Sequence, residues 1–332
     1  MSTLELRGSM VALVTPFKDG AMDETALKRL VEFHVAGGTS ALVPCGTTGE
    51  SATLSHEEHD RVIELVVQTA RGRIPVIAGT GSNNTAEAIR LTKHAKQAGA
   101  DAALLISPYY NRPTQRGLYL HFKAVAEAVD IPLILYNIAS RTGVNIEPDT
   151  IAKLVLELPN VVAIKESSGS LEQMSRILQV TNHRIIVLSG DDALTLPVLS
   201  IGGTGVISVV ANLVPKDVAA LVAAFEQGQA REATAWHDRL LPLIKAVFIE
   251  TNPIPVKTAM GLLGMIDPAL RLPLCAMEGA NRQKLEQALR DYGLLREGTI
   301  GQAPTLVQNP SRPAERKRRS GQSAVHRKAH AN

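Results

Sequence analysis

Eight short apolar runs recur along the first two thirds of the chain, with room for one helix between successive runs. Strands covered on both faces read as continuous apolar runs, and strands that alternate with helical patterns predict βαβ units and a parallel sheet. Eight such units close a barrel. The pattern therefore predicts a (β/α)8 TIM barrel with strands at residues 10–15, 41–44, 75–78, 102–106, 132–136, 161–165, 185–189 and 205–209.

The segments between these runs carry apolar residues at helical spacing, as at residues 23–37, 55–70, 84–98 and 115–129. Ser55 followed by Glu58 has the pattern of a capping box, which begins a helix. An open doubly wound sheet is the rival architecture. The Gly-x-Gly-x-x-Gly motif typical of that fold does not follow the first strand, so the closed barrel is favoured.

Four further helical patterns follow the eighth run with no strand between them, at residues 215–227, 230–250, 256–263 and 278–292. Such helices must bury an apolar face against the barrel or against a neighbouring subunit. We therefore expect a catalytic barrel in residues 1–224 and a C-terminal helical domain in residues 225–298. Lys257 opens the third of these helices, and we expect it at the surface or in an interface.

Residues 299–332 form a basic tail that lacks apolar periodicity, and we expect this tail to be disordered. Residues 311–332 carry seven basic side chains and one acidic side chain, Glu315. Their net charge of +6 exceeds the net charge of +3 for the whole chain. Such a tail could touch nucleic acid or acidic lipids. A simple appendage is the plainer interpretation, and we expect neither a nucleic-acid nor a membrane partner.

The N-terminus shows no signal-peptide pattern, and no run approaches the roughly 18 apolar residues that span a bilayer. Two cysteines, Cys45 and Cys275, give neither a disulfide framework nor a metal-binding spacing. We therefore expect a cytoplasmic protein without a metal site.

Lys165 stands directly after four apolar residues, at the carboxyl end of the sixth predicted strand. Barrel enzymes keep their chemistry at this end of the strands. Lysine is rarely buried without a partner, and a desolvated amine is more often in the free form that attacks a carbonyl. Lys165 therefore predicts Schiff-base chemistry on a keto acid.

Polar motifs also follow three other predicted strands. Residues 46–51 combine glycines and hydroxyls that suit a small anion, although a tight turn before a helix would read the same way. Tyr136 could relay protons and Arg141 could clamp a carboxylate, or they could be rim residues. Tyr109 and Tyr110 lie in a loop bounded by prolines, which suits a subunit contact at least as well as a site.

Together these segments resemble the dihydrodipicolinate synthase branch of the pyruvate-dependent class I aldolases, a family that includes N-acetylneuraminate lyase. The resemblance runs from about residue 8 to residue 295. It rests on the segments at residues 14–17, 46–50, 77–81, 108–113, 189–192, 205–208 and 252–257. Ala139 departs from the family pattern, which most often has proline there, and this adds backbone freedom before Arg141.

The resemblance implies that pyruvate condenses with L-aspartate-4-semialdehyde to 4-hydroxy-tetrahydrodipicolinate, the first committed step of diaminopimelate and lysine biosynthesis, with no cofactor. Lys165 matches the imine lysine. Tyr136, Thr47 and Tyr110 match a proton relay, with Tyr110 reaching in from the adjacent subunit. Thr47 and Thr48 match the pyruvate-carboxylate cradle. The other substrate-binding positions are Arg141, which matches the carboxylate site of the second substrate, and Gly190 and Ile207, which match pocket walls.

The resemblance also implies feedback inhibition by L-lysine and a homotetramer built as a dimer of dimers. The positions that match an effector site are Ser51, Ala52, His56, His59, Asn83, Glu87 and Tyr109. An ordinary polar helix face is the alternative for these residues. A related pyruvate aldolase or lyase acting on a sugar acid is the alternative function, and a non-catalytic barrel with a binding arm is a third.

Overall fold

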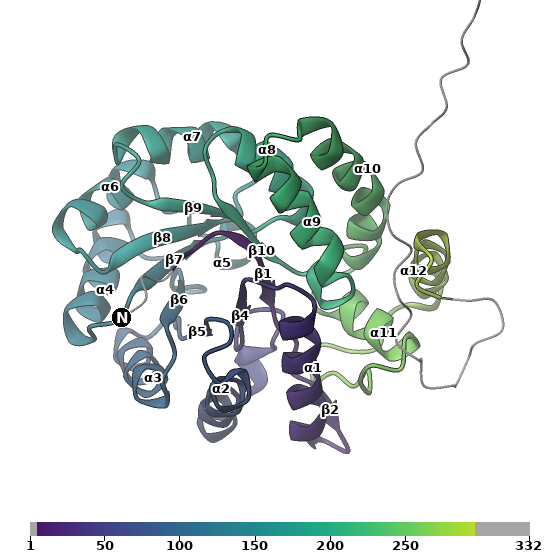
Figure 1. Ribbon diagram of the computed structural model, residues 1–332. Helices are drawn as coiled ribbons and strands as arrows, with labels where there is room; N and C mark the ends of the chain where they lie inside the picture. The colour runs from purple at the N-terminus through teal and green to yellow at the C-terminus, as the bar shows by residue number, and fades with distance from the viewer. Residues whose placement is uncertain (1–4, 296–332) are drawn as a thin grey trace, which may run out of the picture.

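Eight parallel strands form the barrel in the computed structural model, which describes residues 5–295 (Figure 1). They are β1 (Gly8–Ala12), β4 (Ala41–Val43), β5 (Ile77–Gly79), β6 (Ala102–Ile106), β7 (Leu133–Asn137), β8 (Val161–Glu166), β9 (Ile186–Ser189) and β10 (Gly205–Ser208). β1 pairs with both β4 and β10, and a bridge between Leu42 and Val76 links β4 to β5. The predicted (β/α)8 barrel is thereby confirmed.

Helices surround the barrel on its outside, as Figure 1 shows. They are α1 (Glu24–Ala36), α2 (His56–Ala70), α3 (Thr85–Ala98), α4 (Gln115–Ala128), α6 (Pro148–Glu157), α7 (Leu171–Val180), α8 (Thr195–Ser200) and α9 (Pro215–Glu226). The expected capping box begins α2, where Ser55 accepts from the Glu58 backbone and the Glu58 side chain accepts from the Ser55 backbone. Such caps satisfy backbone groups that a helix end leaves unpaired.

The inside of the barrel is filled by a separate apolar cluster, which includes Ile134, Tyr136, Ala163, Leu188 and Ile207. Side chains two positions apart on a strand point to the same face. Lys165 lies two residues after Ala163 on β8, so it points into the barrel near the carboxyl end of the strands.

Three helices follow the barrel: α10 (Ala230–Val247), α11 (Ile254–Leu262) and α12 (Gly279–Tyr292). α10 packs against α9 and α12, and the largest apolar cluster joins these helices to β1, α1 and α2. The domain boundary expected after residue 224 falls in the last turn of α9. The expected tail at residues 299–332 lies outside the described residues.

The expectation for Lys257 was wrong. Its side chain is fully buried on α11. Several short elements also had no clear sequence signal, namely the hairpin of β2 (Phe17–Lys18) and β3 (Ala21–Met22), helix α5 (Ala139–Thr142), and the 3-10 helices η1 (Ser51–Thr53), η2 (Asp192–Leu194) and η3 (Val210–Asn212). Among the described residues, no helix combines the length and apolar character that a membrane crossing requires.

Candidate active site

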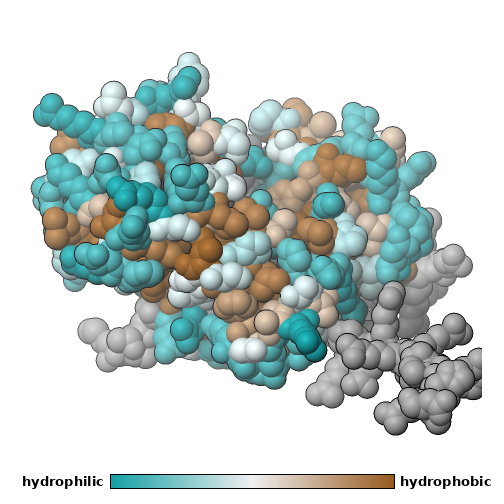
Figure 2. All heavy atoms as spheres, turned by 90° about the horizontal axis from the view of Figure 1, so that it is seen from above, coloured by the Kyte–Doolittle hydropathy of each residue, from teal (hydrophilic) through white to brown (hydrophobic). Residues whose placement is uncertain are grey.

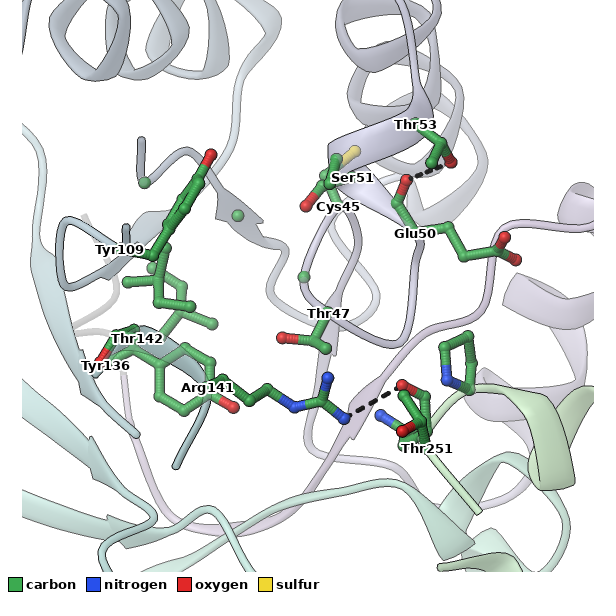
Figure 3. A pocket seen from close by; sticks show the side chains of 18 of the residues that line it. Cys45, Thr47, Glu50, Ser51, Thr53, Tyr109, Tyr136, Arg141, Thr142 and Thr251 are labelled. Atoms are coloured by element: carbon green, nitrogen blue, oxygen red, sulfur yellow. Dashed lines mark hydrogen bonds between the residues drawn. The ribbon is translucent and has the colours of Figure 1, made fainter. Parts of the chain in front are cut away.

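A cavity of about 300 Å³ opens where the loops after β4, β6 and β7 meet the C-terminal segment (Figure 3). Six of the residues singled out from the sequence line it: Thr47, Ser51, Ala52, Tyr109, Tyr136 and Arg141. The residues before α11 and a loop near residue 273 complete its wall. The cavity therefore brings together three of the candidate substrate positions and three of the candidate effector positions, while Lys165 and Glu87 are not among its lining residues.

Lys165 lies beside Tyr136 at the barrel mouth. The two residues are register partners on β8 and β7, and the Lys165 Nζ lies 4.2 Å from the centroid of the Tyr136 ring. Only 6 % of the surface of Lys165 is exposed, so its side chain is buried at the barrel mouth. This arrangement places a nucleophilic amine next to a phenol that can exchange protons with its adducts.

Gly190 lies against the Lys165 side chain at the end of β9. A Cβ atom added to Gly190 would lie 3.0 Å from Lys165 Cε and 3.1 Å from Lys165 Cγ, and it would collide with the Ser167 hydroxyl. Ile207 is buried inside the barrel on β10. Gly190 therefore lies beside Lys165, and its missing side chain leaves space for the lysine.

Thr47 and Thr48 lie in the turn after β4. The Thr47 side chain projects into the cavity, on the side where Tyr136 and Arg141 also project (Figure 3). Thr48 is buried, and its Oγ1 accepts a hydrogen bond of 3.0 Å from Asn252 Nδ2. No direct hydrogen bond joins Thr47 to Tyr136 within residues 5–295.

Arg141 lies on α5 and donates from Nη2 to the main-chain oxygen of Asn252, at 3.1 Å. Its guanidinium lines the cavity, so it can receive a carboxylate there. Ala139 occupies the first position of α5, where proline is readily accommodated in helices. The family preference for proline at this position is thus compatible with the observed backbone.

Within a single chain, Tyr110 lies apart from the other candidate catalytic residues. Its surface is 90 % exposed, its backbone lies in the left-handed region with φ of 69°, and it does not line the cavity. Within a single chain it is not part of the site.

The effector candidates divide into two groups. Ser51, Ala52 and Tyr109 line the cavity. Nearby, His56 Nε2 lies 2.6 Å from Glu87 Oε1, and the Ser82 hydroxyl donates to the other oxygen of Glu87. These bonds, from Ser82 first and then from His56, lower the pKa of Glu87.

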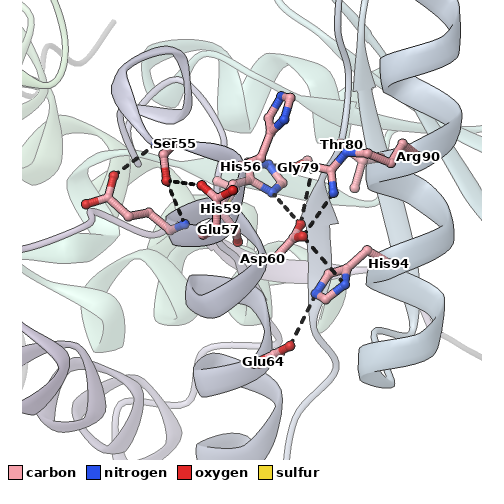
Figure 4. A network of polar contacts seen from close by, with 12 residues as sticks. Ser55, His56, Glu57, His59, Asp60, Glu64, Gly79, Thr80, Arg90 and His94 are labelled. Carbon is pink, nitrogen blue, oxygen red and sulfur yellow. Dashed lines mark hydrogen bonds and ion pairs between the residues drawn. The ribbon is translucent and has the colours of Figure 1, made fainter.

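His59 belongs instead to a polar network between α2 and α3 (Figure 4). Its Nε2 donates to the Gly79 main-chain oxygen at 2.9 Å, and burial lowers its pKa. Asp60 accepts from Arg90 at 2.9 Å, and its Oδ2 lies 3.7 Å from His94 Nδ1. His59 is therefore a buried link between helix and strand. Asn83, in turn, accepts from Asn111 through its main-chain oxygen.

Three functional features were not predicted from the sequence: Asn252, Ser82, and the contact of Glu50 with the buried Lys257. Two of them depend on a partner distant in sequence, Asn252 on Thr48 and Glu50 on Lys257, whereas Ser82 contacts the nearby Glu87. The segment at residues 252–257 was noted only as part of a resemblance. Within the described part of the chain, no group of three or more histidine, cysteine or acidic side chains could hold a metal ion.

Comparison with known proteins agrees with the resemblance seen in the sequence. The chain matches the model of the Dihydrodipicolinate synthetase family over residues 5–292. It is 58 % identical over 289 residues to a protein named 4-hydroxy-tetrahydrodipicolinate synthase from Syntrophus aciditrophicus (strain SB), a match that covers 87 % of this chain and 99 % of that protein.

Two solved structures are similar over nearly their whole length. One is the chloride-inhibited dihydrodipicolinate synthase from Acinetobacter baumannii complexed with pyruvate, at 46 % identity and a TM-score of 0.85, covering 88 % of this chain and 100 % of that chain. The other is the enzyme of that family from Cyanidioschyzon merolae with lysine bound, at 42 % identity and a TM-score of 0.84, covering 87 % and 99 %.

Proposed function

The chain belongs to the dihydrodipicolinate synthetase family, and we propose that its site condenses pyruvate with L-aspartate-4-semialdehyde to form 4-hydroxy-tetrahydrodipicolinate. The observation that carries this proposal is the buried Lys165 side chain, whose Nζ lies 4.2 Å from the centroid of the Tyr136 ring, beside a cavity that Tyr136 and Arg141 line. The reaction is a lyase reaction, and it is the first committed step of diaminopimelate and lysine biosynthesis.

The chemistry begins when the free amine of Lys165 attacks the pyruvate carbonyl and water leaves, which gives a protonated imine. The imine nitrogen accepts electrons, so the pyruvate methyl group loses a proton and becomes an enamine. The enamine carbon attacks the aldehyde carbon of the second substrate, so a carbon–carbon bond forms, the C=O π bond opens to a hydroxyl that takes up a proton, and the enamine returns to the imine. The amine of that substrate then attacks the imine carbon, closes the ring and releases Lys165.

The side chains around Lys165 divide this work. Tyr136 transfers protons through its hydroxyl. Thr47 and Thr48 bind the pyruvate carboxylate with their hydroxyl and backbone donors. Arg141 binds the carboxylate of the second substrate with parallel hydrogen bonds. Gly190 and Ile207 form the walls of the pocket.

Ser51, Ala52 and Tyr109 of the cavity, with the nearby Glu87, support regulation by L-lysine. Glu87 has a lowered pKa, so it is ionised at neutral pH and suits the ammonium groups of lysine. The rest of the candidate effector site consists of Ser51, Ala52, His56, Tyr109, His59 and Asn83. The relative from Cyanidioschyzon merolae was solved with lysine bound, which supports this proposal.

A homotetramer arranged as a dimer of dimers completes the proposal. Tyr110 can join the proton relay only from a neighbouring subunit, because it lies outside the cavity of its own chain. Apolar side chains gather in a band across the face seen in Figure 2. Exposed apolar patches of this kind often mark protein contacts.

Borohydride reduction in the presence of pyruvate tests the proposal. We expect a covalent adduct on Lys165 in the native chain and none in Lys165→Ala. A coupled assay then compares aspartate semialdehyde with N-acetylneuraminate and 2-keto-3-deoxy sugar acids. Turnover of a sugar acid in preference to aspartate semialdehyde would refute the proposed substrate, and absence of the adduct would refute the imine.

A further inference from the structure

Lys257 and Glu50 form an ion pair that no step of the proposed reaction uses. Both side chains are fully buried, and Lys257 Nζ lies 2.5 Å from Glu50 Oε1. Burial lowers the pKa of Lys257, and the charge of Glu50 opposes that shift. Desolvating two charges is costly and often cancels their attraction, so a buried ion pair is weak evidence for a stabilising role.

The contacts of this pair converge on the turn that carries Thr47 and Thr48. Lys257 Nζ also donates to the main-chain oxygen of Thr15 at 3.0 Å, and the Thr15 hydroxyl donates to the main-chain oxygen of Gly49 at 2.7 Å. One buried ammonium therefore fixes the turn both through Glu50 and through Thr15.

Residues on either side of Lys257 in the chain, Asn252 and Arg271, also contact the turn that carries Thr47 and Thr48. Glu50 Oε2 accepts from the backbone of Arg271 at 3.2 Å. Asn252, five residues before Lys257, donates to Thr48 Oγ1 at 3.0 Å. The C-terminal helical segment thus contacts the turn at Thr48 and at Glu50, two positions apart.

The backbone of the turn needs such support. Cys45 and Glu50 have φ values of 56° and 53°, in the left-handed region that residues with side chains adopt only at an energetic cost. These two residues flank the four that include Thr47 and Thr48. Strained conformations persist where the surrounding structure fixes them, and they often occur at functional sites.

We propose that Lys257 is a positioning residue for the pyruvate-carboxylate cradle, because through Glu50 and Thr15 it sets the backbone from which Thr47 and Thr48 bind. Lys257 does not touch the substrate. The inference rests on the proposed function, which gives the cradle to pyruvate. It makes the C-terminal helical segment part of substrate binding in the barrel.

The first variant is Lys257→Met, compared with the native chain and with Leu118→Ala. Leu118 is fully buried on α4 in a different apolar cluster, so its truncation lowers stability away from the turn. The assay measures the pyruvate concentration that half-saturates borohydride trapping on Lys165. We expect an increase of about tenfold or more in Lys257→Met, since displacing binding groups by a fraction of an ångström has effects of this size.

The same two variants separate positioning from stability. Leu118→Ala should lower the thermal unfolding temperature and leave the pyruvate half-saturation within about twofold of the native value. For Lys257→Met, the half-saturating concentration of aspartate semialdehyde should change far less than that of pyruvate. An equal pyruvate shift in Leu118→Ala would overturn the inference, because it would follow from destabilisation alone.

The double variant Glu50→Gln/Lys257→Met guards against a failure of the single variant to fold. Lys257→Met leaves the Glu50 carboxylate buried without its cation, whereas the double variant removes both charges, a change that often costs little stability. We expect near-native thermal unfolding with the pyruvate shift retained. A native half-saturation in this variant would overturn the inference alone, whereas absence of any adduct in the native chain would overturn the proposed function and the inference with it.

Discussion

Replacing Gly190 with alanine should slow imine formation at Lys165 while the barrel remains folded. The added Cβ would lie 3.0 Å from Lys165 Cε and 3.1 Å from Lys165 Cγ, closer than ordinary van der Waals contact. It would also collide with the Ser167 hydroxyl, which is buried and has no hydrogen-bond partner among the described residues. Both neighbours must therefore move when the methyl group is added.

The two collisions have different consequences. Forcing an extra methyl group into a packed region costs roughly 1–3 kcal/mol of stability, and most of this cost comes from the collision with Ser167. The Lys165 contacts require a shift of a few tenths of an ångström in the nucleophile. Misplacing a reacting group by about 1 Å can cost roughly a hundredfold in rate, so we expect about tenfold slower imine formation.

A rescue variant separates these effects. Ser167→Ala removes a hydroxyl that has no partner, so by itself it should change stability by less than about 1 kcal/mol. In Gly190→Ala/Ser167→Ala, chemical unfolding should show most of the lost stability regained. The rate of borohydride trapping at saturating pyruvate should remain about tenfold reduced, because the contacts with Lys165 persist.

Two measurements, stability and trapping rate, decide whether the alanine methyl group displaces Lys165. If the double variant regains both stability and the native trapping rate, the alanine methyl group does not displace Lys165. A native trapping rate in Gly190→Ala itself would refute the reasoning at once.

Three further predictions concern other parts of the molecule. Tyr110→Phe should reduce turnover by about a hundredfold if the hydroxyl relays protons from a neighbouring subunit, with little change in the unfolding temperature because phenylalanine keeps the aromatic ring; native steady-state turnover would remove Tyr110 from the relay. Glu87→Gln should raise the lysine concentration for half-inhibition by about tenfold or more, since a charged hydrogen bond contributes roughly 1.5–3 kcal/mol; an unchanged inhibition curve would place the effector elsewhere. Burial raises the pKa of Asp192, so the folded chain binds more protons than the unfolded chain, and stability falls as pH rises above the unfolded value of about 3.9 towards the raised value. In Asp192→Asn this fall should disappear from urea unfolding series, and identical pH dependence in both chains would contradict it.

The sequence was most informative where structure is determined locally. Residues 161–165 were predicted as a buried strand that ends in a lysine; β8 (Val161–Glu166) confirms the buried strand and extends it one residue beyond Lys165. The run at residues 10–15 was less well placed, because β1 ends at Ala12 and residues 13–15 leave the barrel sheet. An apolar run does not indicate where the pairing partner ends.

Contacts between distant segments could not be predicted. Lys257 was expected at the surface or in an interface, because lysine is rarely buried. Its partner Glu50 is 207 positions away, so no local pattern indicates that the charge is buried and paired. The same holds for Asn252 and Thr48, which are 204 positions apart. Tyr110 illustrates a different limit, because the role implied for it depends on a second subunit.

The closure of the barrel has a consequence for the order of events during synthesis. β1 is made first, yet its register with β10 pairs Gly8 with Gly205. The strands from β5 to β9 pair with neighbours that follow directly in the chain, so they can assemble as they emerge. One edge of β1 must wait unpaired until the eighth strand appears, and an unpaired apolar strand edge invites association with other chains. The first strand to be synthesised is therefore among the last to gain both of its pairing partners. Until then, the nascent chain is most exposed to association with other chains.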